Sequence, residues 1–183
     1  MPTLPFKSDV LVYGNHKIIK LPNEISSQLS SRGMNFAEIR FLSSDGRAIS
    51  DAATAYPLPL EPDGNKSHWF YVPESLCDAL VPGSTLELQL TPQDEWPSPV
   101  VPDDFIEGLK QSSLYDFYHD LTSKAQWEWM RWIQMTNNPS TREKRITVSM
   151  DKMHKGMKRP CCFDQTRCTD YRICSNGMLK ITL

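Results

Sequence analysis

The sequence lacks any apolar run that approaches the roughly 20 residues of a membrane-spanning helix. Its first residues, MPTLPFKSDVLVYG, contain no basic region followed by an apolar run and no small-residue cleavage site. These absences predict a cytoplasmic protein without a secretory signal and without membrane insertion. Because thiols stay reduced in the cytoplasm, we do not expect the cysteines to form a disulfide framework.

The familiar catalytic motifs are absent as well. No Gly-x-Ser-x-Gly, His-Glu-x-x-His or phosphate-loop pattern occurs. The four histidines are isolated from one another in the sequence: His16, His68, His119 and His154. The paired acids Asp103 and Asp104 stand at a predicted helix start, where carboxylates interact favourably with the helix dipole. We therefore expect that the protein is not an enzyme and has no resident cofactor.

The net charge is only −2, but the charges are unevenly distributed. Residues 1–139 contain 10 Lys and Arg against 18 Asp and Glu, a net of −8, whereas residues 140–183 contain 10 against 4, a net of +6. A basic tail on an acidic body suits a nucleic acid or an anionic surface as partner. The alternative is that the tail docks on the acidic body of its own chain.

Short apolar runs separated by turn signals extend from Val10 to about Thr91. The runs are VLVYG, KIIKLP, NFAEIRFL, TAYPLPL, HWFYV and STLELQL. Their length and their β-branched and aromatic residues predict six strands, with Asp45-Gly46 and Asp63-Gly64 as turns. Six short strands in about 80 residues favour a small closed barrel, because closure removes exposed sheet edges.

Two segments between the strands, NEISSQLSSRG and ESLCDAL, begin just after Pro22 and Pro73. A proline followed by polar residues is typical of a helix start, so each segment is predicted to form a short helix at a corner of the barrel. Cys77 lies in the second segment with Leu76 and Leu80 as neighbours. This setting predicts a packed thiol rather than a reactive one.

The periodicity changes after TPQDEWPSPVVPDD, residues 91–104, whose four prolines predict an extended connector. We therefore predict an α+β protein with a β-barrel domain at residues 1–91, a linker at 92–102 and a helical module at 103–183. Residues 103–110 are predicted to form a short turn before three helices. The helices are one over 114–121 capped by Ser112 or Ser113, one carrying Trp129 and Ile133, and one from a Ser140-Thr141-Arg142-Glu143 capping box to Gly156.

The helical part resembles a known bacterial family. The run LTSKAQWEWMRWIQMTNNPSTREKRI, followed by HKGMKRPCCFDQTRCTD, is similar to the C-terminal part of the YdeI or OmpD-associated proteins, also labelled bacteriocin-protection proteins. The segments LPNEISSQLSSRG, HWFYVPESL and WPSPVVPDDF are similar to the β-barrel domain of unknown function that accompanies it. The resemblance implies a barrel of the double-split type, related to DNA-binding transition-state regulators and antitoxins. It also implies a link to envelope stress and cationic-peptide resistance, with no established reaction.

The chain departs from the family pattern at two positions. Gln126 stands where the family has an arginine just before the first tryptophan of the helix, so the resemblance implies that any anion site built from that arginine is weakened here. Cys174 stands where the family tends to have a serine, which argues against a four-cysteine metal site as a shared feature.

Five residues of the helical module are candidates for binding an anion or a partner: Arg131, Arg142, Arg145, Trp127 and Trp132. Arg142 and Arg145 are one turn apart near a predicted helix N-terminus, where backbone amides and two guanidinium groups can meet one anion. The alternative is that they form salt bridges with Asp116, Asp120 or Glu128. Trp127 and Trp132 either pack against the barrel or form a stacking platform.

Four cysteines lie within RPCCFDQTRCTDYRIC, residues 159–174. Structural zinc is usually held by two short-spaced pairs such as C-x-x-C, whereas Cys161 and Cys162 are adjacent and Cys168 follows after five residues. Zinc bound by these three is the weaker alternative to reduced, partly buried thiols that pack against the tryptophan-bearing helix while Arg159 or Arg167 reaches an acidic residue. The basic neighbours keep thiol redox chemistry as a third alternative.

From these patterns we expect a non-catalytic cytoplasmic protein of the YdeI or OmpD-associated type. It is expected to contribute to envelope stress or cationic-peptide tolerance through protein contacts, as a monomer or a weak homodimer. The alternatives are a regulatory protein that binds nucleic acid through the basic tail and a zinc-binding module.

Overall fold

The computed structural model describes residues 2–42, 49, 54–161 and 163–180. The chain divides into two compact units, which are described separately. The first contains Met1–Glu95, Gln165–Cys168 and Gly177–Leu183, and the second contains Trp96–Asp164 and Thr169–Asn176. The C-terminal tail is thus shared between the units, whereas the sequence pattern assigned it wholly to the helical module.

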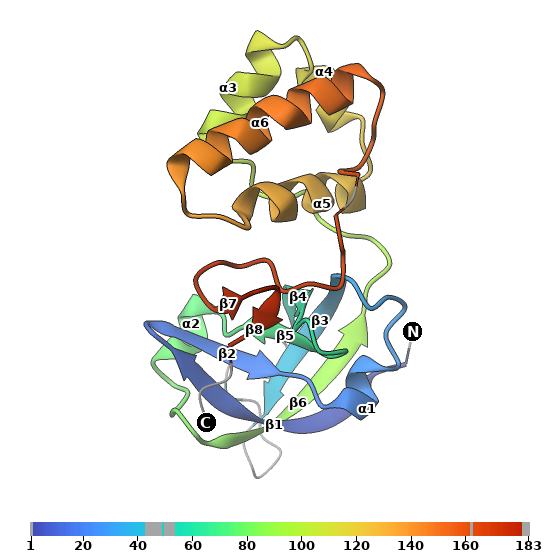
Figure 1. Cartoon of the computed structure of the whole chain (residues 1–183). Helices are drawn as coiled ribbons and strands as arrows, with labels where there is room; N and C mark the ends of the chain where they lie inside the picture. Colours follow the sequence, from blue (N-terminus) through green and yellow to red (C-terminus); the bar gives the residue numbers. More distant parts are fainter. Residues whose placement is uncertain (1, 43–48, 50–53, 162, 181–183) are drawn as a thin grey trace. The chain divides into compact units, whose positions relative to one another are not determined.

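Six antiparallel strands close into a barrel in the first unit (Figure 1), which confirms the predicted architecture. The strands are β1 (Leu4–Tyr13), β2 (His16–Lys20), β3 (Asn35–Leu42), β4 (Tyr56–Pro62), β5 (His68–Tyr71) and β6 (Thr85–Pro92). They pair in the order β1-β2-β5-β4-β3-β6, and β6 returns to pair with β1. The fold is therefore mixed α+β, with a barrel followed by helices.

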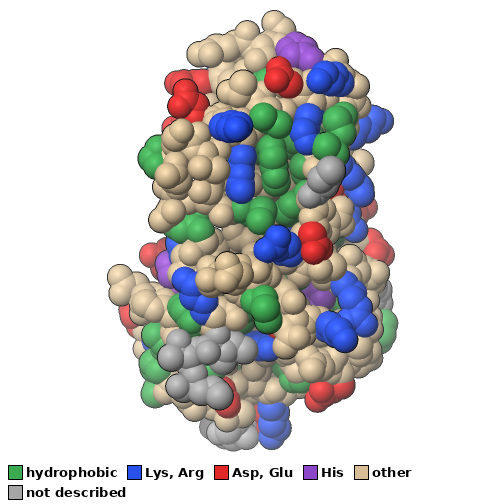
Figure 2. Space-filling view, viewed as in Figure 1, with side chains coloured by type: hydrophobic (Ala, Val, Ile, Leu, Met, Phe, Trp, Pro, Cys, Tyr) green, Lys and Arg blue, Asp and Glu red, His purple; other side chains and the backbone are tan. Residues whose placement is uncertain are grey.

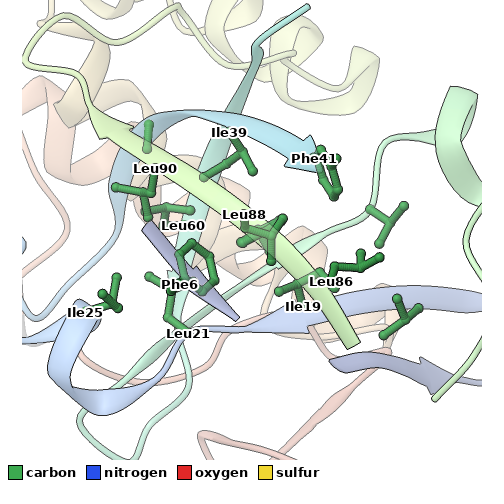
Figure 3. Close-up of a cluster of buried hydrophobic side chains, with 14 of the residues drawn as sticks. Phe6, Ile19, Leu21, Ile25, Ile39, Phe41, Leu60, Leu86, Leu88 and Leu90 are labelled. Atoms are coloured by element: carbon green, nitrogen blue, oxygen red, sulfur yellow. The ribbon is translucent and has the colours of Figure 1, made fainter. Parts of the chain in front are cut away.

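The barrel interior is filled by the alternating apolar residues that the sequence pattern predicted. Leu86, Leu88 and Leu90 on β6 are buried and point inward (Figure 3). Leu88 lies opposite Phe6 of β1 and Phe41 of β3 in the strand register. Complete burial of each such side chain stabilises the fold by about 1.5–3 kcal/mol before entropy is counted.

The first strand is longer than predicted, because it takes part in two pairings. Residues 4–9 pair with β6, and residues 10–13 pair with β2. The prolines at its start weaken the sequence signal there. Of the two predicted turn dipeptides, Asp63-Gly64 forms a turn in which Gly64 has a φ of 77°, and Asp45-Gly46 lies outside the described residues.

Both predicted short helices are present, as α1 (Asn23–Ser26) after Pro22 and α2 (Glu74–Cys77) after Pro73. Cys77 is half-buried against the barrel core, and its sulfur lies 3.8 Å from the carbonyl oxygen of Val72. The prediction of a packed thiol agrees with this position.

The second unit contains four helices of the described residues, where three were predicted. They are α3 (Asp103–Gln111), α4 (Tyr115–His119), α5 (Ser123–Gln134) and α6 (Pro139–His154). The prediction of a short turn at 103–110 was wrong, because Phe105 and Leu109 are one helical turn apart and both are fully buried. Tertiary packing of such an apolar face supplies most of the stability of a short helix. Helix α6 packs against both α3 and α5 (Figure 1).

Helix α6 also begins earlier than the capping-box pattern predicted. Its N-cap is Asn138, whose side-chain oxygen accepts a hydrogen bond from the Thr141 amide at 3.0 Å, and Pro139 occupies the first turn. Ser140 is therefore inside the helix and is not its cap. Gly156 follows the helix end with a φ of 77°, as predicted for a stop.

The tail forms a small two-stranded sheet of β7 (Cys174–Ser175) and β8 (Met178–Leu179). The Cys168 amide donates to the Gly177 carbonyl at 2.8 Å, and the Leu179 amide donates to the Asp63 carbonyl at 2.8 Å. Within the described residues, no helix has both the length and the apolar content needed to cross a bilayer.

Candidate functional site

A groove of about 510 Å³ runs between α3 and α6 in the helical unit. Its lining side chains repeat at helical spacing on both helices, so each turn of α3 and of α6 contributes to it. The acidic lining residues are Asp104, Glu107, Glu143 and Asp151. The apolar floor is formed mainly by Ile146 and Met150 of α6.

Gly108 of α3 permits the two helices to approach at the floor of the groove. A Cβ atom at this position would lie 3.0 Å from the Ile146 Cγ2 atom, closer than side chains normally pack. Met150 is buried beside it. The small residue on α3 and the large residues on α6 thus set the depth of the groove.

One ion pair crosses the groove. The Arg142 guanidinium donates from Nε to Asp104 Oδ2 at 2.6 Å and from Nη2 to Asp104 Oδ1 at 2.8 Å. These hydrogen bonds lower the pKa of Asp104 and raise the pKa of Arg142. Such a two-pronged pair fixes orientation as well as charge. Arg142 is therefore bound internally, to Asp104 rather than to the acids named as alternatives from the sequence.

The groove is acidic after this pair is counted. It has four carboxylates and one guanidinium, which gives a net charge of −3 with His154 neutral. Glu107, Glu143 and Asp151 are exposed, and in the described part of the chain none of them has an ion-pair partner. A concave surface with an apolar floor and unpaired carboxylates is suited to a basic amphipathic ligand.

Trp132 and Arg145, two of the predicted candidates, do meet. The Arg145 guanidinium lies 5.8 Å from the centroid of the Trp132 ring and donates to the Trp132 carbonyl at 2.7 Å. Burial lowers the pKa of Arg145. Lys152 lies 5.4 Å from the same ring and 2.6 Å from the Cys161 sulfur. Trp132 is thus flanked by two cations, and Arg142 and Arg145 do not face one anion.

The other two candidates are one helical turn apart on α5 and make separate contacts. Arg131 is 2% exposed, and its guanidinium lies 5.3 Å from the centroid of the Phe163 ring. Trp127 is half-buried and donates from its indole nitrogen to the Pro97 carbonyl at 2.8 Å. Neither side chain joins the groove or the Trp132 cluster.

Glu128 of α5 is a buried carboxylate. Its nearest cation is Arg159, with Nη1 to Oε1 at 3.6 Å, and within the described residues neither carboxylate oxygen has a hydrogen-bond partner. Burial raises the pKa of Glu128, against the opposing charges of Arg159, Lys124 and Arg131. The predicted contact of Arg159 with an acidic residue is therefore present on the tryptophan-bearing helix.

The cysteines of the tail differ from the prediction of uniformly reduced thiols. Cys168 and Cys174 are each disulfide-bonded, whereas the thiols of Cys77 and Cys161 are not oxidised to disulfides. Cys161 is exposed and contacts Lys152 of α6.

The predicted zinc site at Cys161, Cys162 and Cys168 includes Cys162, which lies outside the described residues. Cys168 is disulfide-bonded, and among the described residues no group of three or more Cys, His, Asp or Glu is placed to hold a metal ion. Zinc at Cys161, Cys162 and Cys168 stays a prediction for the reduced chain.

The acids of the groove were missed by sequence reasoning. Glu107 lies three residues after Asp104, and Asp151 lies eight residues after Glu143, so each pair shares one helix face. This spacing was the available signal, but it also describes any solvated helix face. Only the packing of α3 on α6 brings the two faces together.

Residues 98–156 match the protein family described as "Bacteriocin-protection, YdeI or OmpD-Associated". The matched segment contains all of α3, α4, α5 and α6 and every residue that lines the groove. The resemblance stated from the sequence is confirmed for this segment. No curated protein matches the chain.

Proposed function

Because residues 98–156 match the YdeI or OmpD-associated family, we propose that the protein is non-catalytic and contributes to envelope stress or cationic-peptide tolerance through the α3–α6 groove. The groove is proposed to hold a basic amphipathic segment. The observation that carries the proposal is the acidic groove itself, which lies wholly within the family segment.

Charge and shape both favour such an occupant. Lysine or arginine side chains would meet Glu107, Glu143 and Asp151, while apolar side chains on the same face would cover Ile146 and Met150. An amphipathic helix in a groove is a recurring mode of peptide recognition. The exposed carboxylates also attract a basic ligand over a distance of about one Debye length, roughly 8 Å at physiological salt.

Nucleic acid is the competing partner, since the C-terminal part of the chain is basic. Several of its arginines are already paired with acids of the chain: Arg142 with Asp104, Arg159 with Glu128 and Arg172 with Asp170. On the face shown in Figure 2, Lys and Arg side chains are dispersed among apolar and acidic ones. The pairing of these arginines with acids leaves fewer cations to neutralise phosphates, which favours the peptide over a nucleic acid.

The test is binding of a synthetic amphipathic peptide of Lys and Leu, with a Gln and Leu peptide of the same pattern as the uncharged comparison. We expect saturable binding of the basic peptide that weakens with added salt. The triple variant Glu107→Gln/Glu143→Gln/Asp151→Asn is expected to bind at least about tenfold more weakly, since each exposed charge pair contributes about 0.5–1 kcal/mol.

The matched control is Glu24→Gln/Glu38→Gln/Glu74→Gln, which removes three exposed carboxylates from the barrel unit. It should bind like the unmodified protein. In cells that lack the gene, the control should restore tolerance to a cationic peptide and the groove variant should not. Equal binding by both variants would reject the groove, and steeply salt-dependent binding of DNA or RNA without peptide binding would favour the nucleic-acid alternative.

A further inference from the structure

A second, smaller pocket lies in the barrel unit. It is lined by none of the residues that line the groove. Its volume is about 120 Å³. One wall is the segment from Ser26 to Arg32, which includes the end of α1 and the residues after it. The other wall is the turn between β4 and β5 and the start of β5, which contribute Lys66 and His68.

The first wall is fixed by a buried hydrogen-bond network around His68. The imidazole is 1% exposed, with Nε2 at 2.8 Å from the Gly33 carbonyl and Nδ1 at 2.7 Å from the Ser26 hydroxyl. A carbonyl oxygen only accepts, so Nε2 donates to Gly33. Asn35 donates from Nδ2 to the carbonyls of Ser31 at 2.7 Å and Gly33 at 2.9 Å. Residues 31–35 are thereby held in one conformation.

The second wall is fixed by a buried carboxylate. Asp63 accepts hydrogen bonds at Oδ1 from the amides of Asn65 at 2.6 Å and Ser67 at 2.9 Å. Within this turn Lys66 adopts a φ of 70°, in the left-handed region that residues with a side chain rarely occupy. Strained backbone of this kind is concentrated at ligand sites. Here it presents a lysine to the pocket.

The lining of the pocket is cationic and rich in hydroxyl groups. Arg32 and Lys66 are its charged residues, and it contains no carboxylate. In the part of the chain that the structure describes, neither cation is ion-paired. The Ser31 hydroxyl accepts from the Gly33 amide at 3.0 Å, which leaves its own hydrogen available to donate. Two cations and a hydroxyl donor on a rigid frame form a site for an anion.

We propose that this pocket binds one phosphate-type oxyanion, with Arg32, Lys66 and Ser31 as its donors. The size of the pocket suits a single small ion or the terminal phosphate of a larger molecule. Arg32 and Lys66 are exposed, so the remainder of an organic phosphate extends into solvent. The proposal is independent of the groove, because the two sites share no residue.

The experiment is a titration of the full chain with inorganic phosphate at constant ionic strength, followed by amide resonances of Gly33 and Lys66. We expect saturable shifts with phosphate and sulfate and none with chloride. The variant Arg32→Gln/Lys66→Gln is expected to bind at least about tenfold more weakly, and Ser31→Ala a few-fold more weakly. Glycerol phosphate in place of phosphate separates the sources: tighter binding indicates a phosphate carried on an organic ligand, and equal binding indicates the free ion.

The matched control is Lys7→Gln/Arg40→Gln, which removes the same charge from exposed positions of the same barrel. It should bind phosphate like the unmodified protein. Absence of saturable shifts, or an equal loss in both double variants, would overturn the proposal, since the latter would reflect general charge attraction. All four substituted residues are exposed, so the fold is retained and a negative result is informative.

Discussion

The guanidinium of Arg142 on α6 is held in a two-pronged hydrogen-bonded pair by the carboxylate of Asp104 on α3, at 2.6 and 2.8 Å. Their side chains are 25% and 46% exposed, so solvent screens the pair and its direct contribution to stability is modest. Its larger effect is geometric. The pair joins the first turns of the two helices that form the groove, and it removes the one groove arginine from competition with a basic ligand.

A double-mutant cycle of Asp104→Asn and Arg142→Gln should give a coupling energy of about 0.5–1 kcal/mol in urea unfolding at pH 7. Because the pKa of Asp104 is lowered in the folded state, this coupling is present above the ordinary carboxyl value of 3.8. It is lost as the pH falls through the lowered pKa of the folded state. Arg142→Lys should not restore it, because an ammonium cannot make the two-pronged contact. Additive single effects would contradict the finding.

The N-cap of α6 can be tested by substitution. The sequence pattern predicts Ser140 as the cap, whereas the cap in the structure is Asn138. Asn138→Ala should lower the free energy of unfolding by about 1 kcal/mol, since the Thr141 amide then loses its acceptor. Ser140→Ala should change it by less than about 0.5 kcal/mol, as expected for an exposed position inside a helix. Thermal and urea unfolding of the two variants measure this difference. The reverse ranking would support the capping box.

Features that depend on local sequence were predictable, and features that depend on tertiary packing were not. The barrel was predictable because Leu86, Leu88 and Leu90 alternate with polar residues, and alternation is a property of the strand itself. The cap of α6 was missed because Ser140-Thr141-Arg142-Glu143 fits the capping-box pattern while Asn138, two residues earlier, forms the bond. Both residues are good N-cap types in the sequence, and the tertiary packing of α6 determines which of them is used.

The sites were less predictable than the fold for a physical reason. Glu107 and Asp151 are ordinary exposed acids in the sequence, and they become a groove only when α3 packs on α6. His68 was correctly described as isolated in the sequence, yet its partners Ser26 and Gly33 come from a different segment of the chain. Such constellations are set by tertiary contacts, which periodicity does not encode.

Two glycines with the same backbone conformation should respond very differently to substitution. Gly64 and Gly83 have φ values of 77° and 78°. A Cβ atom at Gly64 would overlap the Gly177 carbonyl oxygen, whereas one at Gly83 would meet nothing within 4 Å. Gly83→Ala should therefore cost only the left-handed strain, about 1 kcal/mol, and Gly64→Ala about 3 kcal/mol or more. Equal costs in urea unfolding would show that the tail does not pack on this turn.

The buried carboxylate of Glu128 should give the free energy of unfolding an unusual dependence on pH. Burial raises its pKa above the usual value of 4.5, so the folded protein binds this proton more tightly than the unfolded chain does. The contribution of Glu128 is therefore most favourable at low pH, falls as the pH rises through 4.5, and levels off above the raised pKa of the folded state. Glu128→Gln removes this decline. The variant should match the unmodified protein near pH 4 and be the more stable of the two at pH 7.

Arg159 does not reverse this expectation, because its contact with Glu128 is long, at 3.6 Å, and its own side chain is 50% exposed. In the Glu128→Gln variant, Arg159 remains solvated, so the loss of its partner costs little stability. A fully buried cation would be left unsatisfied. Glu38→Gln, at an exposed position of the barrel, controls for the loss of one charge. Urea unfolding from pH 4 to 8 compares the three proteins. A Glu128→Gln variant that is less stable at pH 7 would show that attraction to Arg159 and its neighbouring cations outweighs the cost of burying the carboxylate.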